Sequence, residues 1–350
     1  MTPTRPITWF DDHALILDQT RLPHATHMLT LRTLEAAAEA IRDMQIRGAP
    51  LIGATAACGV ALALRDDGSD SRLESALALL AATRPTAVNL HWALERMARR
   101  LRPLPVSDRH AAAVAESHAI IEEDIDTNCR IGQHGLDILR AIAERKHGRV
   151  RVMTHCNAGW LATADHGTAL SPIYAAHAEG MDVSVWVSET RPRNQGLLTA
   201  WELRARGVPH TLIADNAAGL LLMRGEVDVV ITGADRVAAN GDTANKIGTY
   251  LKALAAHDNA VPFYIAAPVS TIDFACPGGE HIPIEDRHGD EVRCIAGLTR
   301  DGQSAEVRIA PSETAVANPA FDVTPARLIT GIITEHGICT PAQVRALGGT

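Results

Sequence analysis

The sequence predicts an α/β protein with a mainly helical N-terminal domain, a small β element and a Rossmann-like C-terminal domain with a mainly parallel sheet. From Leu31 to about Lys146, apolar residues recur at steps of three and four, which is typical of helices. After Gly148, short apolar runs alternate with amphipathic ones, which indicates strands and helices in turn and therefore parallel strand pairing. We expect the N-terminal domain at residues 1–125, a connecting helix at 126–147 and the C-terminal domain at 148–350.

The N-terminal half begins with two short apolar segments, 7–10 and 14–18, that are suited to pairing as a hairpin. Helical periodicity follows them, and Gly-Ser, Arg-Pro-Thr and Arg-Pro-Leu-Pro sequences interrupt it, because glycine and proline tend to end helices. The helices that this pattern predicts cover residues 34–44, 54–67, 71–84, 89–102 and 107–147.

The C-terminal half contains apolar runs without polar alternation, as expected for strands that are buried on both faces. These predicted strands are 150–156, 182–190, 210–216, 227–237 and 262–268. The amphipathic segments between them predict helices at 169–180, 196–207, 217–225 and 245–258. Thr324 followed by Pro325 is typical of an N-cap and first turn, so we also expect a helix within residues 321–337.

The composition limits the classes of function. With 350 residues, 46% of them hydrophobic, the chain can bury a substantial core, and its formal net charge of -8 gives no basic footprint for nucleic acid. Six cysteines form no CxxC pair, so neither a zinc ribbon nor a disulfide scaffold is indicated. No signal-peptide core and no charge-free membrane span are present. We therefore expect a cytoplasmic protein without a nucleic-acid or membrane partner.

A glycine-containing turn lies at residues 47–55. Its two glycines have the spacing of the phosphate-binding pattern GxxxxGK[ST], but Ala54 stands where lysine is required, so a nucleotide P-loop is excluded. Such a turn before a helix can still offer backbone N–H groups to a phosphate, with Arg47 beside it. A plain turn at a helix start explains the pattern equally well. No GxGxxG and no HExxH occur, so we expect neither a dinucleotide cofactor nor a metal.

Polar residues follow the predicted strands at their carboxyl ends, where open α/β sheets bind ligands. Cys156 in this position is either a small buried residue or a nucleophile. Asp235 is either a loop cap or an acid whose pKa apolar surroundings raise. Lys246 is one of three lysines and is expected at a helix start, where a cation opposes the helix dipole, so this position suits an anionic ligand.

Several segments together resemble the 5-methylthioribose-1-phosphate isomerase family of the methionine salvage pathway. They are residues 47–53, 154–163, 188–196, 215–219, 232–250 and 318–337. The similarity begins near Leu17 and covers nearly the whole chain. The wider superfamily includes ribose-1,5-bisphosphate isomerases and the regulatory subunits of the nucleotide exchange factor for translation initiation. Those regulatory subunits share the two-domain fold without the chemistry.

The resemblance implies a homodimer that converts an aldose 1-phosphate into a ketose 1-phosphate without a metal or nucleotide. Carried over residue by residue, it implies that Cys156 and Asp235 are the catalytic pair, with Asp235 suited to protonating the ring oxygen. The residues implied to bind the substrate and its phosphate are Arg47, Gly48, Ala49, Arg84, Gln195, Asn245 and Lys246. The segment 287–313 is longer than in shorter members of the family, and we expect it to touch none of these positions.

Other functions and substrates remain open at this point. A regulatory subunit would need none of these residues, and a sugar-phosphate sensor would need only the phosphate-binding ones, so the presence of all of them favours an enzyme. The alternative substrates are 5-deoxyribose 1-phosphate and ribose 1,5-bisphosphate. Hydrogen could move from C2 to C1 as a proton, with Cys156 as the base, or directly as a hydride.

Overall fold

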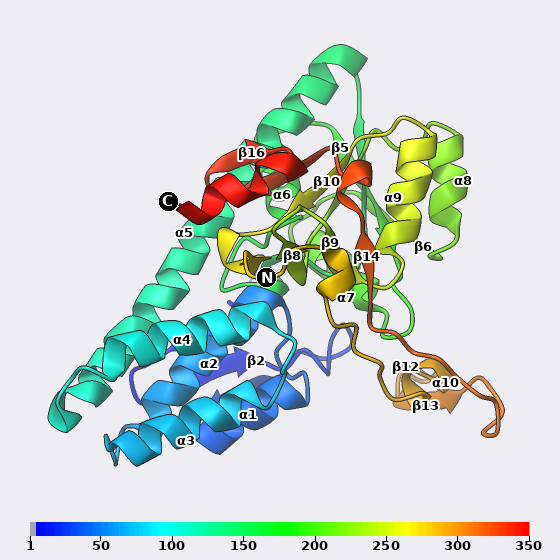
Figure 1. The fold of residues 1–350 in the computed structure, drawn as a ribbon. Helices are drawn as coiled ribbons and strands as arrows, with labels where there is room; N and C mark the ends of the chain where they lie inside the picture. The colour runs from blue at the N-terminus through cyan, green and yellow to red at the C-terminus, as the bar shows by residue number, and fades with distance from the viewer. Residues whose placement is uncertain (1–4, 350) are drawn as a thin grey trace.

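The computed structural model describes residues 5–349. It has an N-terminal domain of packed helices and a C-terminal domain built on a parallel sheet, and helix α5 runs along both (Figure 1). The helices of the first part are α1 (Leu34–Arg42), α2 (Ala49–Ala63), α3 (Asp70–Ala81), α4 (Val88–Leu101) and α5 (Val106–Lys146). Because α5 is one continuous helix, the expected division between residues 125 and 126 falls inside it.

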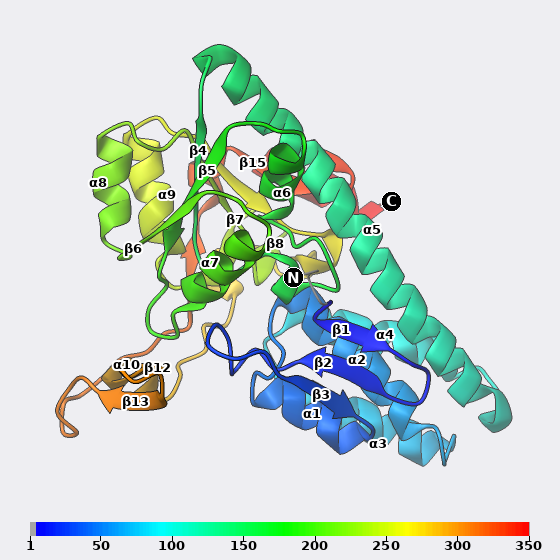
Figure 2. The same cartoon turned by 180° about the vertical axis from the view of Figure 1, so that it is seen from behind.

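A small antiparallel sheet lies against the N-terminal helices (Figure 2). The predicted hairpin is confirmed, since β1 (Ile7–Trp9) pairs with β2 (Ala14–Leu17). A third strand, β3 (Met28–Leu31), pairs with β2 and was not expected. It is only four residues long and half exposed, so its sequence carries little periodic signal.

The C-terminal domain is built on a seven-stranded sheet in the order β16-β15-β10-β7-β4-β5-β6. Its strands are β4 (Val150–Thr154), β5 (Val183–Ser188), β6 (His210–Ile213), β7 (Val229–Thr232), β10 (Phe263–Ala266), β15 (Gly331–Thr334) and β16 (Gly337–Cys339). All neighbours are parallel except the pair β15 and β16. The predicted Rossmann-like fold is therefore confirmed.

Helices cover both faces of this sheet. They are α6 (Ser171–Ala178), α7 (Gln195–Ala205), α8 (Ala217–Met223) and α9 (Thr249–Asp258), together with the second half of α5. Ile231 packs in a core with residues of α5 and α6, whereas its neighbour Val230 packs in a separate core with residues of α8 and α9. Successive side chains of a strand point to opposite faces, which explains why these strands are apolar without alternation.

The expected helix within residues 321–337 is wrong. Phe321–Thr324 form strand β14, which pairs antiparallel with β9 (Thr243–Lys246), and Gly331–Thr334 form the buried strand β15 between β16 and β10. Pro325 ends one strand, and only a three-residue 3-10 turn follows it, at Ala326–Leu328. The run Gly-Ile-Ile-Thr is β-branched and buried on both faces, so sheet pairing overrides the local helix-start signal.

A second, four-stranded sheet has the order β11-β8-β9-β14, with β8 (Arg236–Ala238) and β11 (Ile272–Asp273). It carries residues 236–246 beside the carboxyl end of β7. Beyond it, the segment with α10 (Asp290–Arg293) and the hairpin β12 (Cys294–Leu298) and β13 (Ser304–Arg308) projects away from the body (Figure 1). We call this segment, residues 287–313, the excursion.

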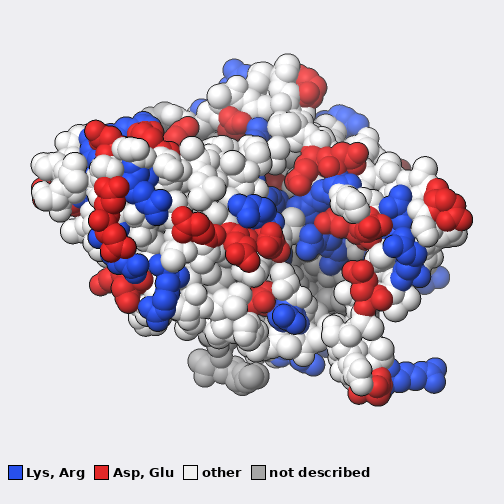
Figure 3. Space-filling view, turned by 90° about the horizontal axis from the view of Figure 1, so that it is seen from below, with Lys and Arg blue, Asp and Glu red and all other residues white. Residues whose placement is uncertain are grey.

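The surface charge does not form one large field on the face that Figure 3 shows. Lysine and arginine side chains are interspersed there with aspartate and glutamate. Within residues 5–349, no helix is both long and apolar enough to cross a membrane.

Candidate active site

All the site residues named from the sequence line one cavity at the junction of the two domains. The set consists of Arg47, Gly48, Ala49, Arg84, Cys156, Gln195, Asp235, Asn245 and Lys246. The cavity lies beyond the carboxyl ends of β4 and β7, as the general rule for open α/β sheets predicts. A second, larger cavity adjoins it, because Met44, Arg47 and Gln195 line both.

The N-terminal domain contributes the start of α2. Gly48 has a φ of 97°, and a Cβ at this position would lie 2.3 Å from the carbonyl oxygen of Ala162. Only glycine combines this backbone conformation with so close an approach of the two domains. Ala49 is the first residue of the 15-residue helix, so its N–H group belongs to the helix end that attracts anions. The turn therefore combines a close contact between the two domains with a helix end that can attract an anion.

Arg47 links the two domains. Its guanidinium donates to the carbonyl oxygen of Asn157 at 3.3 Å and also to the Asn157 side-chain oxygen. The Asn157 amide in turn donates to Glu202 at 3.0 Å and to Thr199 at 3.1 Å. The Arg47 Nε has no hydrogen-bond partner among the described residues although it is buried. Part of this cation therefore remains available for a ligand.

Cys156 follows β4 in a backbone conformation that holds its thiol at the cavity. Its φ is 65°, which is uncommon for a residue other than glycine. The Cys156 N–H donates to the Thr190 hydroxyl at 2.9 Å, and its carbonyl accepts from the Thr199 hydroxyl at 2.8 Å. Burial raises the pKa of the thiol, and the charges of Arg47 and Lys246 act in the opposite direction without overcoming it.

Asp235 lies in the connection between β7 and β8. Its N–H donates to the carbonyl oxygen of Ala244 at 2.9 Å, which fixes the backbone against β9. Burial raises the pKa of the carboxyl group, while Lys246, Arg84 and Arg287 lower it by their charge. The raised pKa is the property that a proton donor requires near neutral pH.

Lys246 does not open a helix, contrary to the expectation. It ends strand β9, and α9 begins three residues later, after Gly248 with a φ of 100°. Strand pairing explains the difference, because Lys246 lies opposite Phe321 in the antiparallel pair of β9 and β14. Its ammonium group lies 4.5 Å from the centre of the Phe321 ring and makes no hydrogen bond or ion pair with a described residue. Burial lowers the pKa of Lys246.

Two neutral side chains complete the predicted set. Gln195 is the first residue of α7, and its side-chain oxygen is buried without a hydrogen-bond partner among the described residues. Asn245 precedes Lys246 on β9, and its amide donates to the Thr249 hydroxyl at 3.0 Å. Both residues are nearly inaccessible to solvent and line the cavity.

Residues that sequence reasoning missed also line the cavity, among them Asn157, Arg287 and Phe321. Asn157 directly follows Cys156, and its adjacency was the only available signal. Arg287 is the first residue of the excursion, so this segment adds a residue to the cavity lining, although it includes none of the positions named from the sequence. No motif marks Arg287, because pairing of residues 286 and 287 with 318 and 319 brings it to the cavity.

No group of three or more histidine, cysteine, aspartate or glutamate side chains within residues 5–349 is arranged to hold a metal ion. The cavity instead combines a buried carboxyl group, a thiol and several cations with free donors. Such a set can protonate a bound sugar and hold an anionic group attached to it.

Comparison with known proteins agrees with this geometry. The chain matches the Initiation factor 2 subunit family over residues 45–341. It is 63% identical to the methylthioribose-1-phosphate isomerase of Dechloromonas aromatica, over 97% of this chain and 95% of that protein. It is 59% identical to the protein of the same name from Gluconobacter oxydans, over 94% of this chain and 90% of that protein.

Solved structures agree with the fold. The crystal structure of 5-methylthioribose 1-phosphate isomerase from Pyrococcus horikoshii superposes with a TM-score of 0.85 at 40% identity, covering 100% of this chain and 96% of that one. A protein of A. fulgidus described as translation initiation factor eIF-2B, subunit delta, gives 0.80 at 37% identity, covering 97% of each chain.

The fold and the cavity define a two-domain α/β protein of the initiation factor 2 subunit family. Within that family, the chain is 63% and 59% identical to two proteins named methylthioribose-1-phosphate isomerase. The chain belongs to the methylthioribose-1-phosphate isomerases.

Proposed function

We propose that this chain is an aldose-ketose isomerase that converts 5-methylthioribose 1-phosphate into 5-methylthioribulose 1-phosphate in methionine salvage. The observation that carries the proposal is that Asp235, Cys156 and several cations with free donors line one cavity. The relatives named for this activity are 63% and 59% identical over nearly the whole chain, which supports the same assignment.

In this proposal, the phosphate binds at the start of α2. The N–H groups of Gly48 and Ala49, the guanidinium groups of Arg47 and Arg84, and the ammonium group of Lys246 surround it. Charge-assisted hydrogen bonds to these donors place the sugar between the two domains. Gln195 and Asn245, which line the same cavity, complete the contacts to the substrate.

Ring opening is the first chemical step. The C1 oxygen carries the phosphate, so the free anomeric hydroxyl that an ordinary aldose uses is missing. The Asp235 carboxyl group, whose pKa is raised by burial, donates its proton to the ring oxygen as the bond from that oxygen to C1 breaks. After this step, C1 is electron-poor and is stabilised by its phosphate-bearing oxygen. Asp235 is then a carboxylate.

Hydrogen then moves from C2 to C1. In a direct shift, the hydrogen carries its electron pair to C1, and the C2 hydroxyl returns a proton to Asp235 as the ketone forms. In the alternative, a Cys156 thiolate removes the C2 proton and returns it to C1. Burial raises the pKa of Cys156, and bound phosphate would offset the two cations that favour its thiolate. The direct shift in a water-poor cavity is therefore the route that we favour.

Turnover of three aldose 1-phosphates by the purified chain tests the proposed function. We expect 5-methylthioribose 1-phosphate to react, because Met44, Ile52 and Ile282 give the cavity apolar lining for a methylthio group. Preferred turnover of 5-deoxyribose 1-phosphate or ribose 1,5-bisphosphate would reassign the substrate. No turnover of any of the three would favour a regulatory subunit.

We further propose a homodimer in the cytoplasm. The resemblance to the family supports the dimer, and six cysteines without a disulfide suit a reducing compartment. Sedimentation at micromolar concentration should give the mass of two chains, and a monomer would remove this part of the proposal.

A further inference from the structure

Arg287 is a buried cation whose hydrogen-bonding capacity is largely unused by the protein. Its side chain is only 7% exposed. Its Nε donates to Glu285 at 3.2 Å, whereas the distance from its Nη1 to the Glu291 carboxylate is 3.9 Å, too long for a hydrogen bond. Its Nη2 approaches only the sulfur of Met44, at 3.9 Å. A guanidinium group has five N–H donors, so most of them lack a strong acceptor in the described structure.

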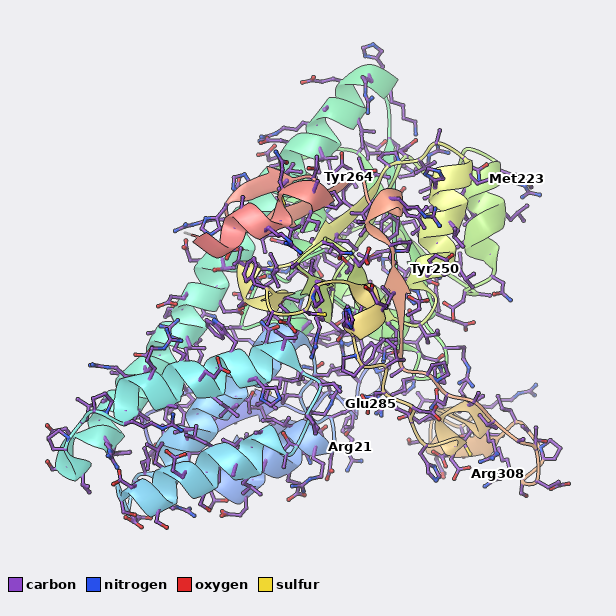
Figure 4. The ribbon with its side chains drawn as sticks, in the orientation of Figure 1. Arg21, Met223, Tyr250, Tyr264, Glu285 and Arg308 are labelled. Carbon is purple, nitrogen blue, oxygen red and sulfur yellow. The ribbon has the colours of Figure 1, made fainter. Side chains whose placement is uncertain are left out.

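The backbone around Arg287 is held firmly in place. The Arg287 N–H donates to the carbonyl oxygen of Asn318 at 2.9 Å. The buried Asn318 side chain donates to the carbonyl oxygen of His288 at 3.0 Å and to Glu291 at 3.1 Å. Glu285 lies where the excursion joins the body, far from Arg308 at its outer end (Figure 4). The excursion therefore begins at a fixed point beside the cavity, and its hairpin does not line that cavity.

Arg287 lines the cavity together with other cations. Arg84 lines the same cavity and donates no hydrogen bond to a described residue. Burial lowers the pKa of Arg84, and the positive charge of Arg287 lowers it further, while Glu285 acts in the opposite direction. Like charges in a poorly solvated space repel strongly, and such an arrangement is costly unless an anion lies between them. An anionic ligand bound in the cavity would reduce this repulsion beyond what Glu285 provides.

We infer that Arg287 is a further phosphate-binding residue, which together with Arg84 binds the phosphoryl group of the substrate. The planar fork of a guanidinium group matches two phosphate oxygens at once, and Glu285, which accepts a hydrogen bond from the Arg287 Nε, orients that fork. The excursion thus supplies a residue of the site through its first position. This inference rests on the proposed sugar-phosphate site.

The test measures binding of inorganic phosphate to the whole chain by titration calorimetry, which requires no turnover. Arg287→Gln should raise the dissociation constant of phosphate about 10- to 100-fold, and Arg287→Lys should raise it less, because a point charge without the fork remains. The matched control is Arg293→Gln, since Arg293 lies on the excursion, bonds to Thr314 and Asp290 and does not line the cavity. Phosphate binding by this control should stay within about twofold of the unaltered chain.

Steady-state kinetics supply the second measurement. Arg287→Gln should raise KM by a factor similar to that for phosphate binding while kcat changes less, because the phosphate is bound alike in the ground and transition states. Unchanged phosphate binding by both Arg287 variants overturns the inference, as does an equal loss in the Arg293 control. If Arg287→Gln fails to fold, Arg287→Lys carries the test. Phosphate binding that depends on Arg287 in a chain without isomerase activity would refute the proposed function alone.

Discussion

Replacing Lys246 by methionine should weaken ligand binding without lowering the free energy of unfolding. The side chain is 6% exposed and makes no hydrogen bond or ion pair with a described residue, so the folded chain bears the cost of burying this charge. Loss of one charge-assisted hydrogen bond to phosphate costs about 1.5–3 kcal/mol, which raises the dissociation constant roughly 10- to 150-fold. Methionine keeps most of the apolar stem beside Phe321, so the free energy of unfolding without ligand should not fall.

The same substitution should change the pH profile. Lys246 lowers the pKa of Asp235, so removing it raises that pKa further. Asp235 must be protonated to donate, and it then stays protonated to a higher pH, so the basic limb of the kcat profile should move upward. Calorimetry, chemical denaturation and the pH profile measure the three effects. An unchanged dissociation constant, or a loss of stability that accounts for weaker binding, would refute this role of Lys246.

Three further predictions concern the same region. Gly48→Ala should lower the free energy of unfolding by about 1–3 kcal/mol in chemical denaturation and weaken phosphate binding. The reason is that a Cβ at this position would lie 2.3 Å from the Ala162 carbonyl oxygen. An unchanged free energy of unfolding would contradict this backbone geometry. Burial lowers the pKa of His155 from its ordinary 6.5 to about 3, so its stabilising contribution, complete above pH 6.5, is lost as the pH falls towards 3. At pH 5 the loss is about 2 kcal/mol. Between pH 7 and 5, the free energy of unfolding should therefore fall by about 2 kcal/mol less in His155→Gln than in the unaltered chain. The same pH dependence in both would exclude His155 as the cause. In heavy water the product should carry no deuterium at C1, whereas deuterium there would indicate proton transfer through Cys156.

The fold was predictable where local and tertiary signals agree. Strands β4, β5, β7 and β10 are mainly apolar, and their alternation with helices specifies the parallel sheet. The helix predicted within residues 321–337 was wrong, because strand pairing with β9 overrides the helix-start signal of Thr324 and Pro325. The short strand β3 was not predicted, because four half-exposed residues give too little periodicity.

That these residues line one cavity was predictable only through the resemblance. Composition and spacing left Cys156, Asp235 and the turn at Arg47 each with two interpretations, because nothing local shows that three distant segments share a cavity. Lys246 was singled out for a wrong structural reason, since it ends a strand and does not open a helix. Arg287 gave no signal, because pairing with residues 318 and 319, about 30 positions away, brings it to the cavity.

Single-turnover and binding measurements on Asp235→Asn test the central claim most directly. The substitution keeps the size of the side chain and removes its acid, so 5-methylthioribose 1-phosphate should still bind with nearly unchanged affinity while ring opening stops. We expect Asp235→Asn to lose several powers of ten in rate, with a dissociation constant within about threefold of that of the unaltered chain. Near-normal turnover by Asp235→Asn would show that the carboxyl group at the end of β7 is not the acid, and the proposed mechanism would be wrong.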